Sequence, residues 1–214
     1  MTLSATAKRY YPGAVQQPGP AHKVYTEANR VEGGILHSAE GYRAGLQSQL
    51  LTAEVSWHFT IYQDGKVEQH YPLDASCWHA GSKASNLRLI GVEHEGRAGE
   101  PLTESQVAAS VALVDWLART AVWPDRARGV RLYEHREVNP ATVCPSGRIP
   151  WGRYVSTAPL PGGEFLPEPV EMRDLGQIAT DLVYGVKNGR VELITHGPSP
   201  ARAGWTRLVV DYLA

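Results

Sequence analysis

The sequence predicts an α/β fold, because short apolar runs, a hairpin signal and one long amphipathic helix follow one another along the chain. Residues 30–37 and 89–92 have the composition and length of buried strands. Residues 55–62 and 67–71 are β-rich, and Asp64 and Gly65 between them are a strong hairpin signal. These segments predict a sheet with helices beside it.

The clearest helix is expected over residues 101–122. Thr103 is a good N-cap, and Gln106 three positions later completes a capping box. Apolar side chains recur at helical spacing and form a stripe that would face the core: Val107, Val111, Leu113, Val114, Leu117 and Ala118. We expect this helix to be scaffold without a role in a site. Residues 41–51 show a partial helical pattern.

Bulk properties exclude several classes of protein. The 214 residues are 43% hydrophobic and 20% charged, which is typical of a soluble globular domain with an appendage. The net charge of −1 favours neither nucleic acid nor an anionic membrane as partner. No run approaches the ~20 apolar residues of a membrane helix, and two cysteines are too few for a disulfide framework.

Residues 132–146 offer an imidazole, His135, and a thiol, Cys144, on what we expect to be one irregular segment. Asn139 and Pro140 between them oppose helix and strand, because proline lacks an N–H and restricts the residue before it. A loop of this length can bend back and aim both side chains at one point. An imidazole nitrogen and a thiolate sulfur together suit zinc.

A third ligand candidate is His37, at the exit of the apolar run over residues 30–37. A histidine held by a buried strand has the rigidity that a metal ligand needs. Three protein ligands with the fourth position open to water would indicate a catalytic zinc, whereas four would indicate a structural one. The spacing itself fits no zinc-finger pattern.

Four stretches of the chain carry a resemblance to a known family. They are ILHSAEG (35–41), VSWHFTIYQDG (55–65), ASCWHAG (75–81) with IGVEHEG (90–96), and HREV (135–138) with TVCP (142–145). In this order they resemble the zinc-dependent N-acetylmuramoyl-L-alanine amidases, which include phage endolysins and peptidoglycan recognition proteins. The resemblance covers about residues 25–157.

The resemblance implies a central mixed β-sheet flanked by helices, with Zn²⁺ held by His37, His135 and Cys144. It also implies hydrolysis of the amide between N-acetylmuramic acid and L-alanine of peptidoglycan. Because these ligands must shed protons to bind metal, we expect activity to fall in mild acid. A flat profile down to about pH 4 would count against this ligand set.

Glu93 is the expected general base, at the end of the strand over residues 89–92. Some family members place a tyrosine before the His-Phe pair of residues 58–59, and others a glutamate at position 93. This chain has Trp57 and Glu93, so it follows the glutamate pattern. We expect Glu95 to point away from Glu93 and therefore favour Glu93. The alternative is a carboxylate that only orients a ligand histidine.

Other residues are expected around the reacting bond. The Thr142 hydroxyl could donate to the oxyanion, with His79 as a second candidate. Substrate contacts are expected from Trp57, His58, Trp78 and His79. Core packing of Trp78 and a purely structural, hydrogen-bonded His58 are the alternatives. A Cys77–Cys144 disulfide is the competing interpretation of the two cysteines.

Changes in composition divide the chain into four parts. We expect an N-terminal arm, the zinc amidase catalytic domain, a Pro/Gly-rich linker and a small β-rich extension over residues 1–22, 23–157, 158–169 and 170–214. Within the extension, Asn188 and Gly189 predict a hairpin, and residues 205–213 a third strand. We expect this piece to pack on the catalytic domain, with dimerisation and cell-wall binding as alternatives.

Three functions remain open, of which a phage endolysin is preferred. Residues 1–9 contain no apolar run suited to a signal peptide. We therefore expect synthesis in a cytoplasm, that of the host for a phage protein, and action on the wall after release. A cytosolic amidase that recycles muropeptides is the first alternative; Glu93 favours it, but Cys144 opposes it because the recycling enzymes place aspartate there. A non-catalytic peptidoglycan-binding module is the second. A monomer is favoured.

Overall fold

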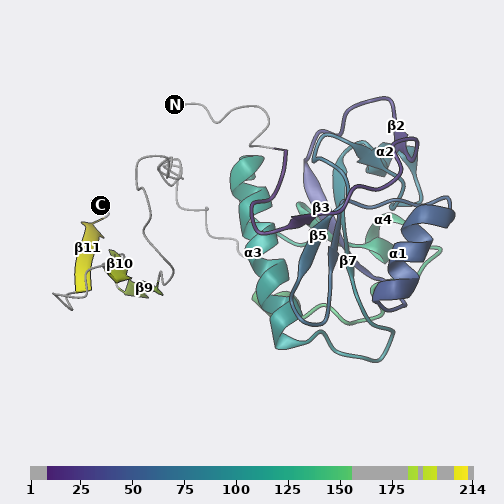
Figure 1. Ribbon diagram of the computed structural model, residues 1–214. Helices are drawn as coiled ribbons and strands as arrows, with labels where there is room; N and C mark the ends of the chain where they lie inside the picture. The colour runs from purple at the N-terminus through teal and green to yellow at the C-terminus, as the bar shows by residue number, and fades with distance from the viewer. Residues whose placement is uncertain (1–8, 156–182, 188–189, 197–204, 212–214) are drawn as a thin grey trace. The chain divides into compact units, whose positions relative to one another are not determined.

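A computed structural model describes residues 9–155, 183–187, 190–196 and 205–211 (Figure 1). The chain divides into two compact units, residues 1–163 and 164–214. The predicted linker over residues 158–169 lies outside the described residues, as do residues 1–8 of the predicted arm and 170–182 of the predicted extension.

A mixed sheet forms the centre of the first unit. Among the described residues six strands make this sheet, in the order β1-β5-β4-β7-β3-β8. Their bounds are β1 Val15–Gln16, β3 Gly33–Ser38, β4 Phe59–Ile61, β5 Val67–Gln69, β7 Leu89–His94 and β8 Leu132–Glu134. Strands β4, β7, β3 and β8 run parallel, and β5 is antiparallel to β4. A separate antiparallel pair joins β2 (Val24–Tyr25) to β6 (Ser76–Cys77).

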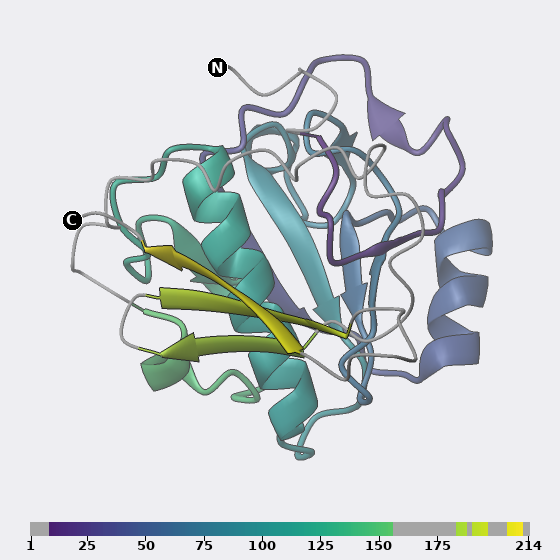
Figure 2. The ribbon, with the colours of Figure 1, turned by 60° about the vertical axis from the view of Figure 1, so that its left-hand side comes forward.

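The sheet lies between α3 (Glu104–Thr120) and α1 (Arg43–Thr52), as Figures 1 and 2 show from two directions. Leu113 and Leu117 of α3 pack in the main core cluster with Leu36 and other strand residues. Leu46 of α1 packs in a second cluster. Short helical turns, α2 (Lys83–Asn86), α4 (His135–Val138) and η1 (Trp151–Arg153), complete the unit. The predicted α/β fold with a mixed sheet flanked by helices is confirmed.

The capping box predicted for α3 is present. The Thr103 side chain accepts from the Gln106 N–H, and the Gln106 side chain accepts from the Thr103 N–H. Helix α3 therefore begins one residue after Thr103, which is its N-cap. Within the described residues no helix has the length and apolar character needed to cross a membrane.

The predicted hairpin is present, although its strands are shorter than expected. β4 and β5 pair antiparallel across a turn in which the Gly65 N–H donates to the Tyr62 carbonyl. Before Phe59 the Ser56 N–H donates outside the sheet, to the Trp78 carbonyl, whereas His58 still bonds to the neighbouring strands: its N–H donates to the Gly91 carbonyl of β7, and its carbonyl accepts from the His70 N–H.

The described part of the N-terminal arm is packed rather than loose. β1 adds to the sheet edge beside β5, and the Tyr11 ring lies 5.1 Å from the Trp116 ring of α3, centroid to centroid. The Gln69 side chain accepts from the Tyr11 N–H and donates to the Arg9 carbonyl. The arm thus covers an edge strand that would otherwise expose unpaired backbone groups.

The second unit contains an antiparallel sheet in the order β11-β10-β9. β9 (Val183–Lys187) and β10 (Arg190–His196) lie on either side of residues 188–189, where the hairpin was predicted. β11 (Trp205–Asp211) is the predicted third strand. The small β-rich C-terminal appendage is therefore present.

Candidate metal centre

The carboxyl ends of three neighbouring parallel strands meet at one edge of the sheet. The register pairs His37 of β3 with Glu93 of β7, and Leu36 of β3 with Glu134 of β8. His135 follows Glu134 directly. Parallel sheets commonly place ligand sites at the carboxyl ends of their strands. Here the register alone brings His37, Glu93 and His135 into one neighbourhood.

The loop after β8 returns Cys144 to the same place. The segment is not irregular from its start, since residues His135–Val138 form the single turn α4, with Asn139 as its C-cap. The Arg136 N–H donates to the Cys144 carbonyl at 3.0 Å, which closes the loop on itself. The Ser38 N–H then donates to Cys144 Sγ at 3.2 Å, so the end of β3 holds the thiol.

The three predicted ligands converge. One ligand atom from each of His37, His135 and Cys144 lies within 4.8 Å of the others. His37 Nδ1 is 3.7 Å from Cys144 Sγ, close to the separation of two ligands on a zinc ion with bonds of about 2.0–2.3 Å. The His37 and His135 rings are 4.6 Å apart between centroids.

The chemistry of these atoms fits a cation. His135 Nε2 is buried and has no hydrogen-bond partner among the described residues. A buried polar atom of this kind is normally paired, and a bound ion would satisfy it. Burial lowers the pKa of His37 well below its usual value, with His79 and His135 adding to the shift, and burial also lowers the pKa of His135. Both shifts favour the neutral imidazole, which offers a lone pair. Two neutral imidazoles and a thiol are a ligand set that suits zinc.

The raised pKa of the Cys144 thiol opposes the thiolate form that would bind a metal. Burial raises the pKa of Cys144 to about 12, with the Glu93 carboxyl adding to the shift and the Ser38 N–H opposing it. A cation bound between the three residues would reverse this, because a coordinating thiol loses its proton. Metal binding and thiol ionisation at this site are thus linked.

Glu93 faces the same space. Its Oε1 lies 3.8 Å from His37 Nδ1, and its Oε2 is buried without a partner among the described residues. Burial raises the pKa of Glu93 to about 8; Glu40 adds to the shift and Arg148 opposes it. A carboxyl with a displaced pKa beside a ligand cluster is a candidate acid or base.

Glu95 points away from Glu93, as expected, but strand alternation is not the cause. Residues two apart in one strand share a face, so alternation would put Glu95 beside Glu93. Strand β7 ends at His94, and beyond it the Glu95 carboxylate accepts from the N–H groups of Arg43 and Gln63, each at 2.7 Å. Glu95 therefore anchors the first turn of α1 and does not face the ligand atoms.

Thr142 lies on the returning loop and is half-buried. Its Oγ1 accepts from the Cys144 N–H at 3.1 Å. The hydroxyl proton remains available to a further acceptor.

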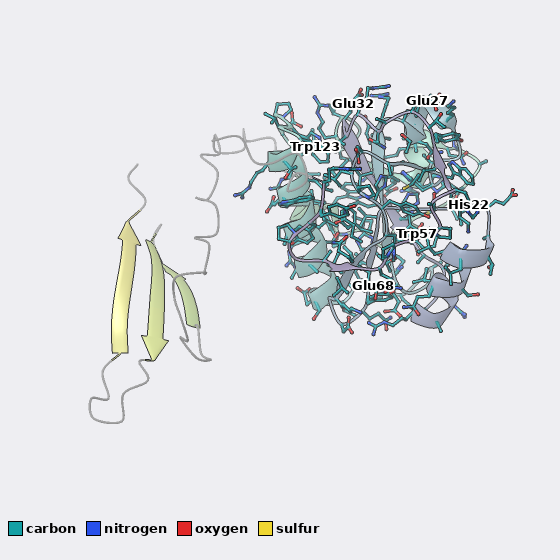
Figure 3. The ribbon with its side chains drawn as sticks, turned by 45° about the horizontal axis from the view of Figure 1, so that its top comes forward. His22, Glu27, Glu32, Trp57, Glu68 and Trp123 are labelled. Carbon is teal, nitrogen blue, oxygen red and sulfur yellow. The ribbon has the colours of Figure 1, made fainter. Side chains whose placement is uncertain are left out.

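The four predicted substrate contacts separate into buried and accessible residues. Trp57 and His58 are buried: Trp57 Nε1 donates to Thr60 Oγ1, and His58 Nε2 donates to the Ala75 carbonyl. Figure 3 labels Trp57, which lies in the second core cluster. Their burial speaks against direct contact with a substrate and favours the structural interpretation of His58. Trp78 is half-buried beside Tyr25 and keeps some surface.

His79 is 7% exposed and lies behind His37. Its Nδ1 is 3.1 Å from His37 Nε2, and its Nε2 is 3.1 Å from the Leu89 carbonyl. Burial lowers the pKa of His79 to about 3, with His58 adding to the shift. The ring thus contacts a predicted ligand histidine.

Arg148 also supports the site, although it is not predicted from the sequence. It is buried, and its guanidinium donates to Ser38 Oγ and to the carbonyls of His94, Glu95 and Glu100. These contacts tie the ends of β3 and β7 together beside the ligands. No motif in the sequence marks this arginine, because its acceptors are mostly backbone carbonyls.

Both cysteines are free in the described part of the chain, which includes each of them. Cys77 is buried in β6, within the cluster formed around α1, whereas Cys144 Sγ lies 3.7 Å from Nδ1 of the predicted ligand His37. The disulfide interpretation is therefore wrong.

Comparison with known proteins gives a consistent result. The family model described as N-acetylmuramoyl-L-alanine amidase matches residues 24–147. N-acetylmuramoyl-L-alanine amidase A of Achromobacter lyticus is 36% identical over 90 residues, 41% of this chain and 50% of the relative. The 1,6-anhydro-N-acetylmuramyl-L-alanine amidase AmpD of Escherichia coli is 28% identical over 118 residues, 50% of this chain and 60% of the relative. The matches thus span about half the length of these curated relatives.

Solved structures share the fold. The endolysin N-acetylmuramoyl-L-alanine amidase LysCS from Clostridium intestinale superposes with a TM-score of 0.50 at 20% identity, covering 68% of this chain and 95% of that one. At this identity the likeness concerns the fold alone.

Proposed function

The chain belongs to the N-acetylmuramoyl-L-alanine amidase family, and from this premise we propose that it is a zinc-dependent hydrolase of the amide between N-acetylmuramic acid and L-alanine in peptidoglycan. The observation that carries the proposal is the convergence of His37, His135 and Cys144 at one edge of the sheet. A carboxyl, Glu93, stands beside them with one oxygen unpartnered among the described residues.

Different residues of the chain have different proposed roles in amide hydrolysis. His37, His135 and Cys144 would hold the zinc, which when bound polarises the scissile carbonyl and lowers the pKa of water. Glu93 takes the proton from the attacking water and later passes it to the leaving L-alanine amine. This proton transfer needs a carboxylate beside the proposed ligands; Glu93 lies 3.8 Å from His37 Nδ1, whereas Glu95 is bonded to the Arg43 N–H, which supports Glu93 for this role.

Thr142 is the proposed donor to the oxyanion. Its Oγ1 is held by the Cys144 N–H, so the hydroxyl has a fixed position and a proton left to donate. Trp78 is the proposed aromatic contact for a sugar or peptide face, because among the predicted contacts it combines an aromatic ring with accessible surface.

A test of the reaction and the metal uses purified peptidoglycan digested with and without a zinc chelator. We expect mass spectrometry to find stem peptides with a free L-alanine amine, lost on chelation and restored by added zinc. Absence of cleavage by zinc-loaded protein would contradict the proposal and favour a non-catalytic peptidoglycan-binding module. A His135→Ala protein that kept full activity and full zinc would refute the ligand set.

For the biological role we propose a phage endolysin that acts on the cell wall after release. The resemblance to amidases with cysteine at the third ligand position supports this choice. The sequence similarity to AmpD favours a second candidate, an amidase of soluble muropeptides.

The two roles differ in substrate size. An endolysin should release stem peptides from intact sacculi, whereas a recycling enzyme should prefer soluble anhydro-muropeptides. Parallel assays on both substrates at equal enzyme concentration decide between them. Cleavage of the soluble fragments together with inert sacculi would exclude the endolysin role.

A further inference from the structure

Behind His37 lies a chain of hydrogen bonds that the proposed mechanism does not use. The Leu89 carbonyl is 3.1 Å from His79 Nε2, and His79 Nδ1 is 3.1 Å from His37 Nε2. A carbonyl oxygen only accepts, so His79 Nε2 carries the proton and His79 Nδ1 is left as a bare acceptor. His37 Nε2 must then donate, and His37 Nδ1 is left with its lone pair.

The position of His79 is built by several neighbours. Asn86 Oδ1 accepts from the backbone N–H groups of His79 and Ala80, at 3.1 and 2.8 Å. Asn29 Nδ2 donates to the carbonyls of Asn86 and Leu89, at 2.8 and 3.0 Å. All of these groups are buried in the described structure. The Leu89 carbonyl oxygen, which accepts from His79 Nε2, is thereby fixed in place.

Gly91 makes room for the ring. A Cβ built on Gly91 would lie 2.6 Å from His79 Cγ and 2.8 Å from His79 Nδ1. Only glycine at this position lets the imidazole lie directly on strand β7. Gly91 pairs with Ile35 of β3, two residues before His37, so the ring lies between the strand and the ligand it contacts.

We propose that His79 is a positioning residue that fixes His37 as the Nε2–H tautomer, with the Nδ1 lone pair directed at Cys144 Sγ. This inference rests on the proposed function, since it concerns how a metal ligand is prepared. It replaces the substrate contact that the sequence suggested for His79. The opposite tautomer of His37 would set two bare nitrogens against each other at 3.1 Å, unless His79 gave up its bond to Leu89.

The wild-type protein provides the first test. In zinc-free protein with ¹⁵N-labelled histidines, multiple-bond NMR spectra at neutral pH should show both His37 and His79 as Nε2–H tautomers. A through-hydrogen-bond coupling should connect His37 Nε2 with His79 Nδ1. A His37 protonated at Nδ1, or a tautomeric mixture, would overturn the proposal without any substitution.

Substitution provides the second test. His79→Leu removes the acceptor, and we expect the tautomer preference of His37 to be lost and zinc affinity to fall by about 10–100-fold. His79→Gln offers an amide oxygen to His37 Nε2 and should restore part of both. Unchanged zinc affinity and an unchanged His37 tautomer in folded His79→Leu would contradict the proposal.

His70→Gln is the matched control. His70 is also buried, and its ring bonds to the Gln17 carbonyl and to Thr60 Oγ1, neither of which belongs to a proposed ligand. Its replacement should lower stability and leave zinc affinity within twofold of wild type. An equal loss of affinity in both variants would show that general destabilisation, not the His79 bond, is responsible.

These experiments distinguish failure of the positioning role of His79 from failure of the proposed hydrolase function. If the tautomers are as expected but peptidoglycan is not cleaved, the hydrolase proposal fails and the positioning role stands. If peptidoglycan is cleaved and His79→Leu leaves the His37 tautomer unchanged, the positioning role fails and the hydrolase proposal stands.

Discussion

At the residue scale, two glutamates that lie two positions apart in the sequence have different surroundings. Glu93 has one oxygen near His37 and another unpartnered among the described residues, whereas Glu95 accepts two backbone N–H groups. A carboxylate that is fully engaged cannot exchange protons with a substrate without losing those bonds. Sequence position does not show which of the two glutamates can act as a base, but their hydrogen bonds do.

Replacing Glu93 by glutamine should therefore remove the proton carrier and leave the ligands intact. We expect Glu93→Gln to lower kcat by roughly 10²–10⁴-fold while zinc content stays that of wild type. Peptide release from peptidoglycan and metal analysis of the same preparation measure both quantities.

Glu95→Gln is the matched comparison. It should lower the free energy of unfolding by about 0.5–2 kcal/mol, as loss of a helix-capping group does, and keep most of the activity per folded molecule. Comparable inactivation of both variants would show that Glu93 is not specifically the base.

The two cysteines allow a second test at this scale. Cys144→Ala should lower zinc affinity by more than the roughly 10–100-fold caused by losing an outer hydrogen-bond partner, because Sγ is one of the three converging atoms. Cys77→Ala removes a thiol of the core cluster and should leave zinc affinity unchanged. Metal titration with a competing chelator measures each. Normal zinc binding by Cys144→Ala would contradict the ligand assignment.

At the element scale, helix α3 supports the sheet from the face opposite to α1. Leu113 and Leu117 are fully buried against strand residues that include Leu36, the neighbour of His37. His94, which pairs with Ser38 in the register, donates to the His37 carbonyl and accepts from Ser110 of α3. The helix thus holds the strand that carries a proposed ligand, although none of its residues belongs to the ligand cluster.

Leu117→Ala should cost about 2–5 kcal/mol of unfolding free energy, because it leaves a cavity in the core. Arg119→Ala, exposed on the last turn, should cost at most about 1 kcal/mol. Denaturant unfolding of zinc-free protein measures both. Equal effects of the two substitutions would contradict the packing described for α3.

At the scale of the whole molecule, neutral histidines are built into the core. Burial lowers the pKa of His58 to about 4, with hydrogen bonding to Ala75 opposing the shift, and burial also lowers the pKa of His70. A histidine whose pKa falls on folding stabilises the protein above its unfolded pKa of about 6.5. That stability is lost as pH falls through the folded pKa.

We therefore expect zinc-free protein to lose stability between about pH 6.5 and pH 4, with His58 alone contributing on the order of 3 kcal/mol. Urea unfolding at several pH values measures the slope. His70→Gln should flatten part of it, since the amide does not titrate. A stability that is constant across this window would contradict the neutral, buried state of these rings.

Much of the fold and of the ligand set could be predicted from the sequence. The capping box of α3, the hairpin at Asp64 and Gly65, and the extension's strands depend on local chemistry, namely turn residues, caps and periodicity. His37, His135 and Cys144 could be named because a recognisable motif surrounds each of them. Their convergence within 4.8 Å is a property of the fold.

Other features depended on contacts between segments far apart in the sequence. Trp57 is buried in the second core cluster, and His58 is buried against β7, where its N–H donates to the Gly91 carbonyl and its Nδ1 accepts from the Gly91 N–H. Glu95 turns away from the predicted ligands because β7 ends at His94. Arg148 joins the ends of β3 and β7 mostly through backbone carbonyls, which carry no sequence signature.

The sequence by itself determined which residue types and local elements are present, since propensities, caps and turns act over a few neighbouring residues. Tertiary structure alone decided which imidazole faces a ligand and which faces the core. The physical reason is that a hydrogen-bond partner such as the Leu89 carbonyl for His79 is selected by strand register and burial, and these arise only when distant segments pack together.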